Sequence, residues 1–137
     1  MRVVLDRNLQ TPQDARVLDN SVPTLIIHAT DTKPRPAEFA RAECIAVAVQ
    51  DGHLDLGAVL RELAARGVNE LQVEAGATLC GVLFQQGLVD ELLLYISPIL
   101  LGDQARPLLA LPSIVDMAAG RRLRVVDQRR IGEDLSL

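Results

Sequence analysis

Short apolar runs alternate along this chain with helical patterns, and this alternation limits the folds that the chain can adopt. The expected strands, each bounded by turn-forming or charged residues, are 2–5, 24–29, 44–49, 71–74 and 91–96. One helix is expected after Asp55, its cap, and before Gly67, and a second over about 77–86. The pattern predicts an α/β domain with a mostly parallel central sheet and helices on both faces.

The remaining segments complete this expected order of elements. Residues 31–36 should form a loop because Pro34 and Pro36 interrupt any strand ladder. Residues 123–127 and 134–137 are expected to form a hairpin, which would be an antiparallel C-terminal edge of the sheet. The chain has 137 residues and no internal repeat, so we expect one domain over residues 1–137.

Composition excludes several classes of protein. Hydrophobic residues make up 49% of the chain and aromatic residues only 2%, which predicts a folded core of Leu, Val, Ile and Ala. No apolar run is long enough to span a bilayer. An apolar strand-like segment follows Met1 at once, so no secretory signal is expected and the expected compartment is the cytoplasm.

The net charge and the spacing of possible metal ligands also disfavour some functions. The formal net charge of −4 disfavours nucleic-acid binding, and the arginines of 121–130 are interpreted as solvated charges around an edge strand. Cys44 and Cys80 form no close pair and are expected to be reduced thiols. Because the two histidines, His28 and His53, also lack partners at ligand spacing, we expect no metal site.

The segment from Val73 to Leu79 is the best candidate for a functional site. A strand followed by small residues and a helix presents unpaired backbone N–H groups at the helix N-terminus, which suits an anion. Thr78 could add a hydroxyl donor, and Gly81 would allow close approach of the sheet or a ligand. The spacing from Gly76 to Gly81 lacks the Lys that follows in nucleotide-triphosphate loops. From the residues alone, a tight turn without ligand is equally compatible.

Glu74 has two interpretations. It lies at the carboxyl end of an expected strand, where ligands gather in open α/β sheets. A carboxylate there could orient a polar substrate, or carry a proton if burial raised its pKa. Alternatively, Glu74 is an exposed or locally bonded side chain, and the residues by themselves favour that second interpretation.

Several motifs, in order along the chain, resemble the C-terminal reductase domain of bacterial bifunctional riboflavin-biosynthesis deaminase/reductases. The most specific is Val-Glu-Ala-Gly-Ala-Thr-Leu-Cys-Gly at 73–81. Other matching segments are 2–6, 52–56, 86–92, 95–98, 100–106 and 131–135. The resemblance covers essentially the whole chain.

The resemblance implies a fold like that of dihydrofolate reductase and an NADPH-dependent activity. In the family, the ribosyl group of 5-amino-6-(5-phosphoribosylamino)uracil is reduced to ribityl. The position matching Glu74 contacts this phosphorylated substrate. The positions that line the cofactor pyrophosphate match Gly76, Ala77, Thr78, Leu79, Cys80, Gly81 and Val82.

Arg7 is a further cofactor-binding candidate. It stands after the strand 2–5, where relatives often carry Ser or Thr. Arg7 could contact the 2′-phosphate of NADPH and favour that cofactor over NADH. The alternative is a solvated loop charge.

Comparison with the family also predicts what this chain lacks. The family's reductase domain begins upstream of the segment matching Met1, and the zinc-dependent deaminase domain is absent, so we expect neither deamination nor zinc binding. A sheet without a central strand exposes apolar surface, which predicts a homodimer or larger assembly. A cis peptide is expected between Ala75 and Gly76.

Two alternatives to this reductase remain open. One is another reductase of the dihydrofolate-reductase type that acts on a different pterin or pyrimidine. The other is a non-catalytic fragment or assembly module. The catalytic proton donor cannot be assigned from the sequence.

Overall fold

A computed structural model describes residues 1–33, 39 and 41–137, so the expected loop at 31–36 lies partly outside the described residues. The chain divides into two compact units, Met1–Leu71 and Gln72–Leu137, which are described separately. Among the described residues, no helix is sufficiently long and apolar to cross a membrane.

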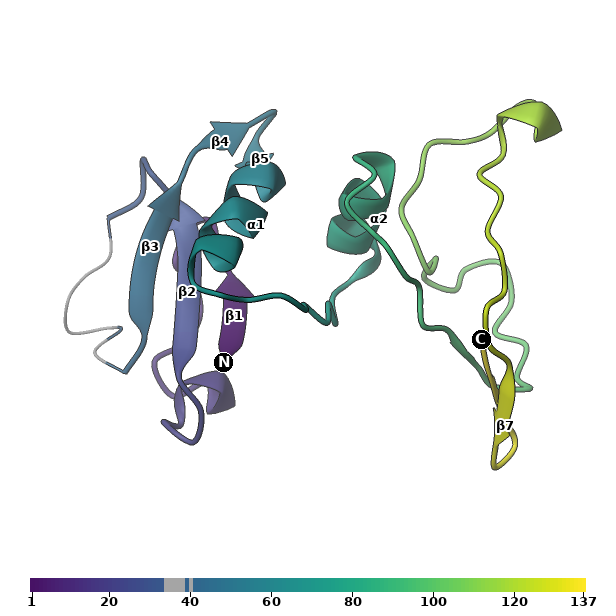
Figure 1. The fold of residues 1–137 in the computed structure, drawn as a ribbon, viewed down its shortest axis with the longest axis horizontal. Coiled ribbons are helices and arrows are strands. Elements are labelled where there is room, and N and C mark those ends of the chain that lie inside the picture. Colours follow the sequence, from purple (N-terminus) through teal and green to yellow (C-terminus); the bar gives the residue numbers. More distant parts are fainter. Residues whose placement is uncertain (34–38, 40) are drawn as a thin grey trace. The chain divides into compact units, whose positions relative to one another are not determined.

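A parallel three-stranded sheet forms the centre of the first unit (Figure 1). Its strands are β1 (Arg2–Leu5), β2 (Thr24–Ala29) and β3 (Glu43–Val47), and β2 lies in the middle. The other elements are the 3-10 helix η1 (Arg16–Leu18), the short strands β4 (Val49–Gln50) and β5 (His53–Leu54), and the helix α1 (Leu56–Ala65). The positions expected for β1, β2 and α1 are thereby confirmed.

Alternate side chains of β2 build two apolar clusters on opposite faces of this sheet. Leu25 and Ile27 pack with Val59 and Leu63 of α1, which covers one face (Figure 1). Ile26 points the other way and packs with Leu18 of η1 and with Phe39. Because β2 is buried on both sides, it reads as a continuous apolar run, as central parallel strands do.

Both ends of α1 follow the signals in the sequence. The Asp55 carboxylate accepts a hydrogen bond of 2.9 Å from the Ala58 N–H, which satisfies one of the free donors of the first turn. After the last turn, Gly67 takes a φ of 80°, and the Val68 N–H donates to the Leu63 carbonyl at 3.1 Å. The expected cap and stop of this helix are confirmed.

The expected strand at 44–49 is divided in two. β3 ends at Val47, and β4 pairs with β5 in a hairpin whose turn residues, Asp51 and Gly52, both have positive φ. Such an Asp-Gly turn matches the twist of antiparallel strands. The turn therefore draws Val49 out of the parallel sheet and into a local hairpin.

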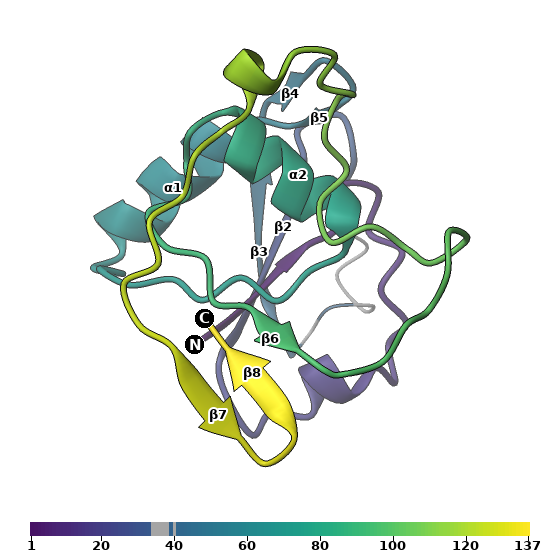
Figure 2. The ribbon, with the colours of Figure 1, turned by 90° about the vertical axis from the view of Figure 1, so that its right-hand side faces the viewer.

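The second unit contains the helix α2 (Ala77–Gln85), the 3-10 helix η2 (Met117–Ala119) and a small antiparallel sheet (Figure 2). The sheet has the order β6-β8-β7, from β6 (Tyr95–Ile96), β7 (Arg129–Ile131) and β8 (Asp134–Ser136). The expected second helix and an antiparallel C-terminal hairpin are confirmed, but the hairpin pairs with β6 in a sheet of its own and, among the described residues, is not hydrogen-bonded to the parallel sheet as an edge.

Three expectations for residues 71–137 are wrong in detail. Residues 71–74 form no strand, and the expected strand at 91–96 contracts to β6. The first hairpin strand is β7 and not 123–127, because the two-residue turn of Gly132 and Glu133 pairs Ile131 with Asp134. Apolar alternation alone does not make a strand, since a strand also needs a partner.

The expected cis peptide is also wrong: the described residues have no cis peptide bond, so the bond between Ala75 and Gly76 is trans. Gly76 instead has extended dihedral angles, φ −73° and ψ 166°, which lead directly into α2. The turn from extended chain to helix is therefore made without an unusual peptide bond.

Candidate functional site

The N-terminus of α2 is the centre of the candidate site. Gly76 is its N-cap and provides no capping side chain, and the first turn has no acidic residue. The first intrahelical hydrogen bond runs from the Cys80 N–H to the Gly76 carbonyl at 3.2 Å. The N–H groups of Ala77, Thr78 and Leu79 precede it and therefore have no partner within the helix. Their positive partial charge suits a phosphate.

Space for an anion exists beside these donors. A Cβ atom added to Gly76 would meet no atom within 4 Å, so the backbone there is open to close approach. The side chains of Ala75 and Ala77 are small, and the Thr78 side chain is exposed. These features fit the pyrophosphate group that the resemblance implies for 76–82.

Gly81 serves a different neighbour from the one expected. A Cβ atom on Gly81 would lie 2.5 Å from the carbonyl oxygen of Ala110 and 3.0 Å from its nitrogen. The Ala110 N–H donates to the Ala77 carbonyl at 3.0 Å, so this backbone lies directly against the first two turns of α2. The absence of a side chain at Gly81 thus admits a segment of the protein itself.

Arg121 holds the other end of the same helix. Its guanidinium donates to the carbonyls of Phe84 at 2.6 Å and Gln85 at 3.0 Å, and it lies 5.6 Å from the centre of the Phe84 ring. A cation at a helix C-terminus is stabilising because the last carbonyls carry partial negative charge. The interpretation of Arg121 as a merely solvated charge is therefore wrong.

Glu74 lies in the extended segment before α2 and is exposed. One carboxylate oxygen, Oε1, accepts a hydrogen bond of 2.8 Å from the Gln72 side-chain amide. On the first turn of α2, the Cys80 thiol lies 3.5 Å from the Ala75 carbonyl oxygen, to which it donates. Leu79 and Val82 are half-buried.

Arg7 belongs to the first unit, in the loop that follows β1. Its side chain is exposed, and its backbone carbonyl accepts a hydrogen bond of 3.1 Å from the Ala29 N–H. The loop lies at the carboxyl end of parallel strands, which is the end where open α/β sheets bind ligands.

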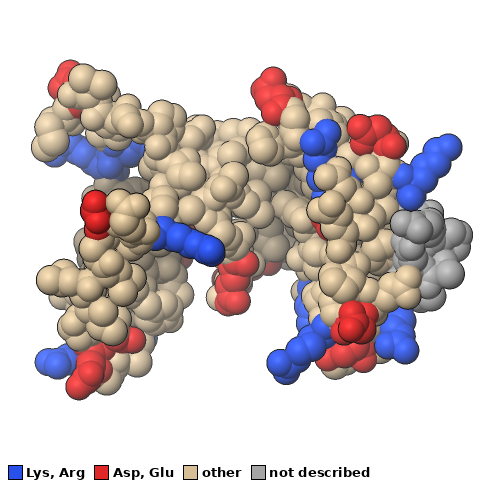
Figure 3. Space-filling model, turned by 180° about the vertical axis from the view of Figure 1, so that it is seen from behind, with Lys and Arg blue, Asp and Glu red and all other residues tan. Residues whose placement is uncertain are grey.

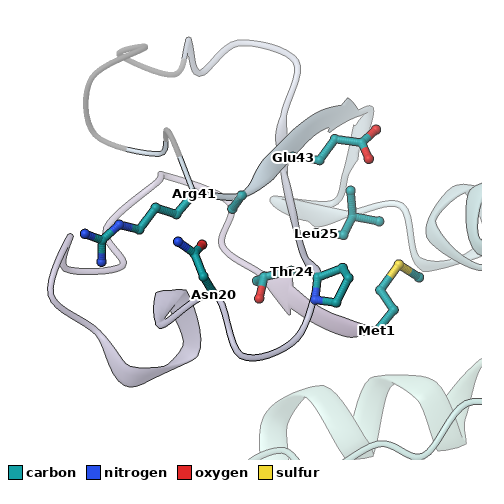
Figure 4. Close-up of a pocket in the computed structure, with 8 residues that line it drawn as sticks. Met1, Asn20, Thr24, Leu25, Arg41 and Glu43 are labelled. Atoms are coloured by element: carbon teal, nitrogen blue, oxygen red, sulfur yellow. The ribbon is translucent and has the colours of Figure 1, made fainter.

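A shallow depression at the opposite, amino ends of these strands is a poorer candidate (Figure 4). It is lined by Met1, Thr24, Leu25 and Glu43, among others, which stand at the beginnings of β1, β2 and β3. The Glu43 carboxylate is already bound by Arg66, whose guanidinium donates to both of its oxygens at 2.9 Å and 2.7 Å. We assign no function to this depression.

Charge and metal-ligand groups do not indicate a further site. On the face shown in Figure 3, acidic and basic side chains are interspersed. The described residues include no group of three or more His, Cys, Asp or Glu that could hold a metal ion. Burial raises the pKa of the Cys44 thiol, which opposes formation of a reactive thiolate.

The fold therefore defines an α/β protein with a parallel sheet and an anion-compatible turn from extended chain to helix. The chain belongs to the RibD C-terminal domain family, whose model matches residues 1–137. The predicted family resemblance and the predicted α/β fold class are both confirmed.

Two relatives of this chain have names that are consistent with this family. The riboflavin biosynthesis protein RibD of Escherichia coli K12 is 33% identical over 137 residues, which are all of this chain and 37% of that protein. The 2,5-diamino-6-ribosylamino-4(3H)-pyrimidinone 5′-phosphate reductase of Methanothermobacter thermautotrophicus is 33% identical over 136 residues, 98% of this chain and 63% of that reductase. This chain thus spans less than two thirds of either relative.

A solved structure of RibD from Acinetobacter baumannii matches with a TM-score of 0.84 and 27% identity. The match covers 98% of this chain and 35% of that one. The likeness therefore extends through both units.

Proposed function

We propose that this chain carries the nicotinamide-dependent reductase function of its family, with NADPH as the reductant. The observation that carries the proposal is the uncapped N-terminus of α2, where the N–H groups of Ala77, Thr78 and Leu79 have no hydrogen-bond partner among the described residues and lie beside an open Gly76. The name of the relative from Methanothermobacter thermautotrophicus, a pyrimidinone 5′-phosphate reductase, supports the reaction class. The proposed substrate is 5-amino-6-(5-phosphoribosylamino)uracil, which becomes its ribitylamino form.

The residues of this chain would bind and orient the reactants. The free N–H groups of α2 and the Thr78 hydroxyl would hold the cofactor pyrophosphate, with Cys80 and Val82 in the adjoining turn. The exposed Glu74 carboxylate, supported by Gln72, would accept hydrogen bonds from substrate hydroxyl or N–H groups. NADPH, when bound, would supply the hydride that the anomeric carbon of the ring-opened imine accepts, and the imine nitrogen would take up a proton from solvent. The main contribution of the protein would be to align the hydride-donating carbon of the nicotinamide with the anomeric carbon of the substrate.

Arg7 carries a separate part of the proposal, a preference for the cofactor with a 2′-phosphate. A guanidinium can form paired, charge-assisted hydrogen bonds to a phosphate monoester. The ribose hydroxyl of NADH offers no such charge.

A Thr78→Glu variant tests the phosphate site. A carboxylate in the first turn should favour the helix, so the free energy of unfolding should stay the same or rise by about 0.3–1 kcal/mol. The same charge should repel the pyrophosphate and lower NADPH affinity on the order of tenfold or more. Fluorescence titration with NADPH and urea unfolding measure the two effects.

Thr78→Gln is the matched control, since it has a similar size and no charge. Equal NADPH affinity of the Glu and Gln variants would refute the phosphate site. No binding of NADPH by the unaltered chain at millimolar concentration would refute the reductase proposal and favour a non-catalytic module.

We also propose that the chain acts in the cytoplasm as a homodimer. Many large apolar side chains of the second unit are exposed, among them Leu100, Leu101 and Val115. Surface of this kind is commonly covered by a partner. Sedimentation velocity should show a dimer that persists at micromolar concentration, and a monomer at all concentrations would contradict the proposal.

A further inference from the structure

The loop after β1 is closed by its own first side chain, Asp6. Oxygen Oδ1 of Asp6 accepts from the Gln10 N–H at 2.9 Å. Oxygen Oδ2 accepts from both the N–H and the hydroxyl of Thr11, each at 2.6 Å. One carboxylate therefore ties together the two ends of the segment that carries Arg7.

The backbone of Arg7 is fixed on both sides to the central strand β2. The Asp6 N–H donates to the Ile27 carbonyl at 2.9 Å, and the Arg7 carbonyl accepts from the Ala29 N–H at 3.1 Å. These two bonds fix where the Arg7 side chain leaves the sheet. They do not fix the rest of the loop, which the Asp6 carboxylate must hold.

Leu9 shows that this loop needs to be held. Its φ of 54° lies in the left-handed region, which is unfavourable for a residue with a branched side chain. The Leu9 N–H donates to the Asp6 carbonyl at 3.1 Å, so the strained residue is spanned by bonds to Asp6. Without the carboxylate, this conformation would lose most of its support.

The charge of Asp6 is directed into the loop. Burial raises the pKa of its carboxyl, but hydrogen bonds from the Thr11 side chain and from backbone N–H groups outweigh that effect, so the pKa lies below its usual value. The group is therefore ionised at neutral pH. Its stabilising effect is present there and is lost as the pH falls through the lowered pKa.

We propose that Asp6 is a positioning residue that holds the Arg7 loop in the shape that receives the 2′-phosphate of a phosphorylated adenosine. This inference rests on the proposed function of Arg7 and adds the residue on which its selectivity depends. Asp6 itself would not contact the phosphate, because both of its oxygens accept from donors of the loop.

The test compares two small probes, adenosine 2′,5′-bisphosphate and adenosine 5′-monophosphate, by calorimetric titration of the full chain. Arg7→Ala should lower the affinity ratio of the two probes on the order of tenfold, as expected for a lost charge-assisted hydrogen bond. Asp6→Ala should lower the same ratio several-fold. On the Arg7→Ala background, Asp6→Ala should change the ratio no further.

Thr11 provides a matched pair of variants. Thr11→Ser keeps the hydroxyl that donates to Asp6 and should keep the ratio, whereas Thr11→Val removes the hydroxyl at nearly constant volume and should lower it. Asp14→Ala removes an exposed carboxylate of the same region and should leave the ratio unchanged.

The outcomes separate the two proposals. If the unaltered chain does not prefer the bisphosphate, or if Arg7→Ala leaves the preference intact, the proposed role of Arg7 fails and this inference fails with it. If Arg7→Ala lowers the ratio but Asp6→Ala and Thr11→Val do not, only the positioning role is overturned. Equal losses of affinity for both probes in Asp6→Ala would also overturn it, because they would indicate a general structural defect.

Discussion

Replacing Gly81 by alanine should destabilise the second unit by about 1–3 kcal/mol or more, as overpacking of a close contact does. The added Cβ would lie 2.5 Å from the Ala110 carbonyl oxygen, and the nearby atoms are all backbone atoms of Ala110. No side chain can rotate away, so α2 and the segment around Ala110 must separate. The hydrogen bond of 3.0 Å from the Ala110 N–H to the Ala77 carbonyl should then be lost. Urea unfolding and hydrogen exchange of the α2 amides measure the effect.

Gly57 of α1 provides the control, because it is also a helical glycine. An added Cβ there would lie 3.2 Å from the tip of the Arg61 side chain, which can adjust, and 3.2 Å from Oδ1 of Asp55, which caps the helix and can give way only slightly. The gain in helix propensity, up to about 1 kcal/mol, should offset a small disturbance of the cap, so Gly57→Ala should change the unfolding free energy much less than Gly81→Ala does. Equal stability of the Gly81→Ala protein and the unaltered chain would mean that Ala110 does not pack closely against α2.

A glycine in a family motif can be required by a contact within the protein and not by the ligand. Gly81 lies in the segment that the resemblance assigns to the cofactor pyrophosphate, yet the contacts of Gly81 are with Ala110. If Gly81→Ala weakens NADPH binding, it should do so by displacing α2. Ala77, Thr78 and Leu79 remain the residues whose N–H groups would contact the phosphates.

Local signals in the sequence were sufficient for the elements that depend on nearby residues. The Asp55 cap and the Gly67 stop each act within a few residues, and each is found where it was expected. The strand expected at 24–29 is also found, and all six of its residues are buried because a central parallel strand is covered on both faces. These features fix most of the first unit.

Contacts between distant residues could not be predicted in the same way. Arg121 binds the carbonyl of Phe84, which is 37 residues away, and nothing in either local sequence indicates the pairing. The contact of Gly81 with Ala110 is hidden for the same reason. Asp6 is an intermediate case, because its partners Gln10 and Thr11 lie only four and five residues further along the chain. The proposed effect of Asp6 on Arg7 could nevertheless be inferred only from the structure.

The second large effect is expected in the core of the first unit, where Leu63→Ala should cost about 2–5 kcal/mol of unfolding free energy. Leu63, a residue of α1, is 2% exposed and packs with the β2 side chains Leu25 and Ile27. Because aromatic residues make up only 2% of the chain, few large side chains are available to fill the resulting cavity. Circular dichroism during urea unfolding measures the loss.

Leu60→Ala, on the same helix, is the control for this experiment. Leu60 is only half-buried, so the same truncation should remove less contact and cost less. The difference between the two variants isolates the packing of α1 on the sheet from the intrinsic helix propensity, which the two replacements change equally. Equal losses of unfolding free energy in the two variants would mean that Leu63 is not the main contact of α1 with β2. A larger loss of unfolding free energy in Leu63→Ala would show that α1 stabilises β2 from this face of the sheet. The strand β1, which leads into the Asp6 loop, pairs with β2 and would depend on the same packing.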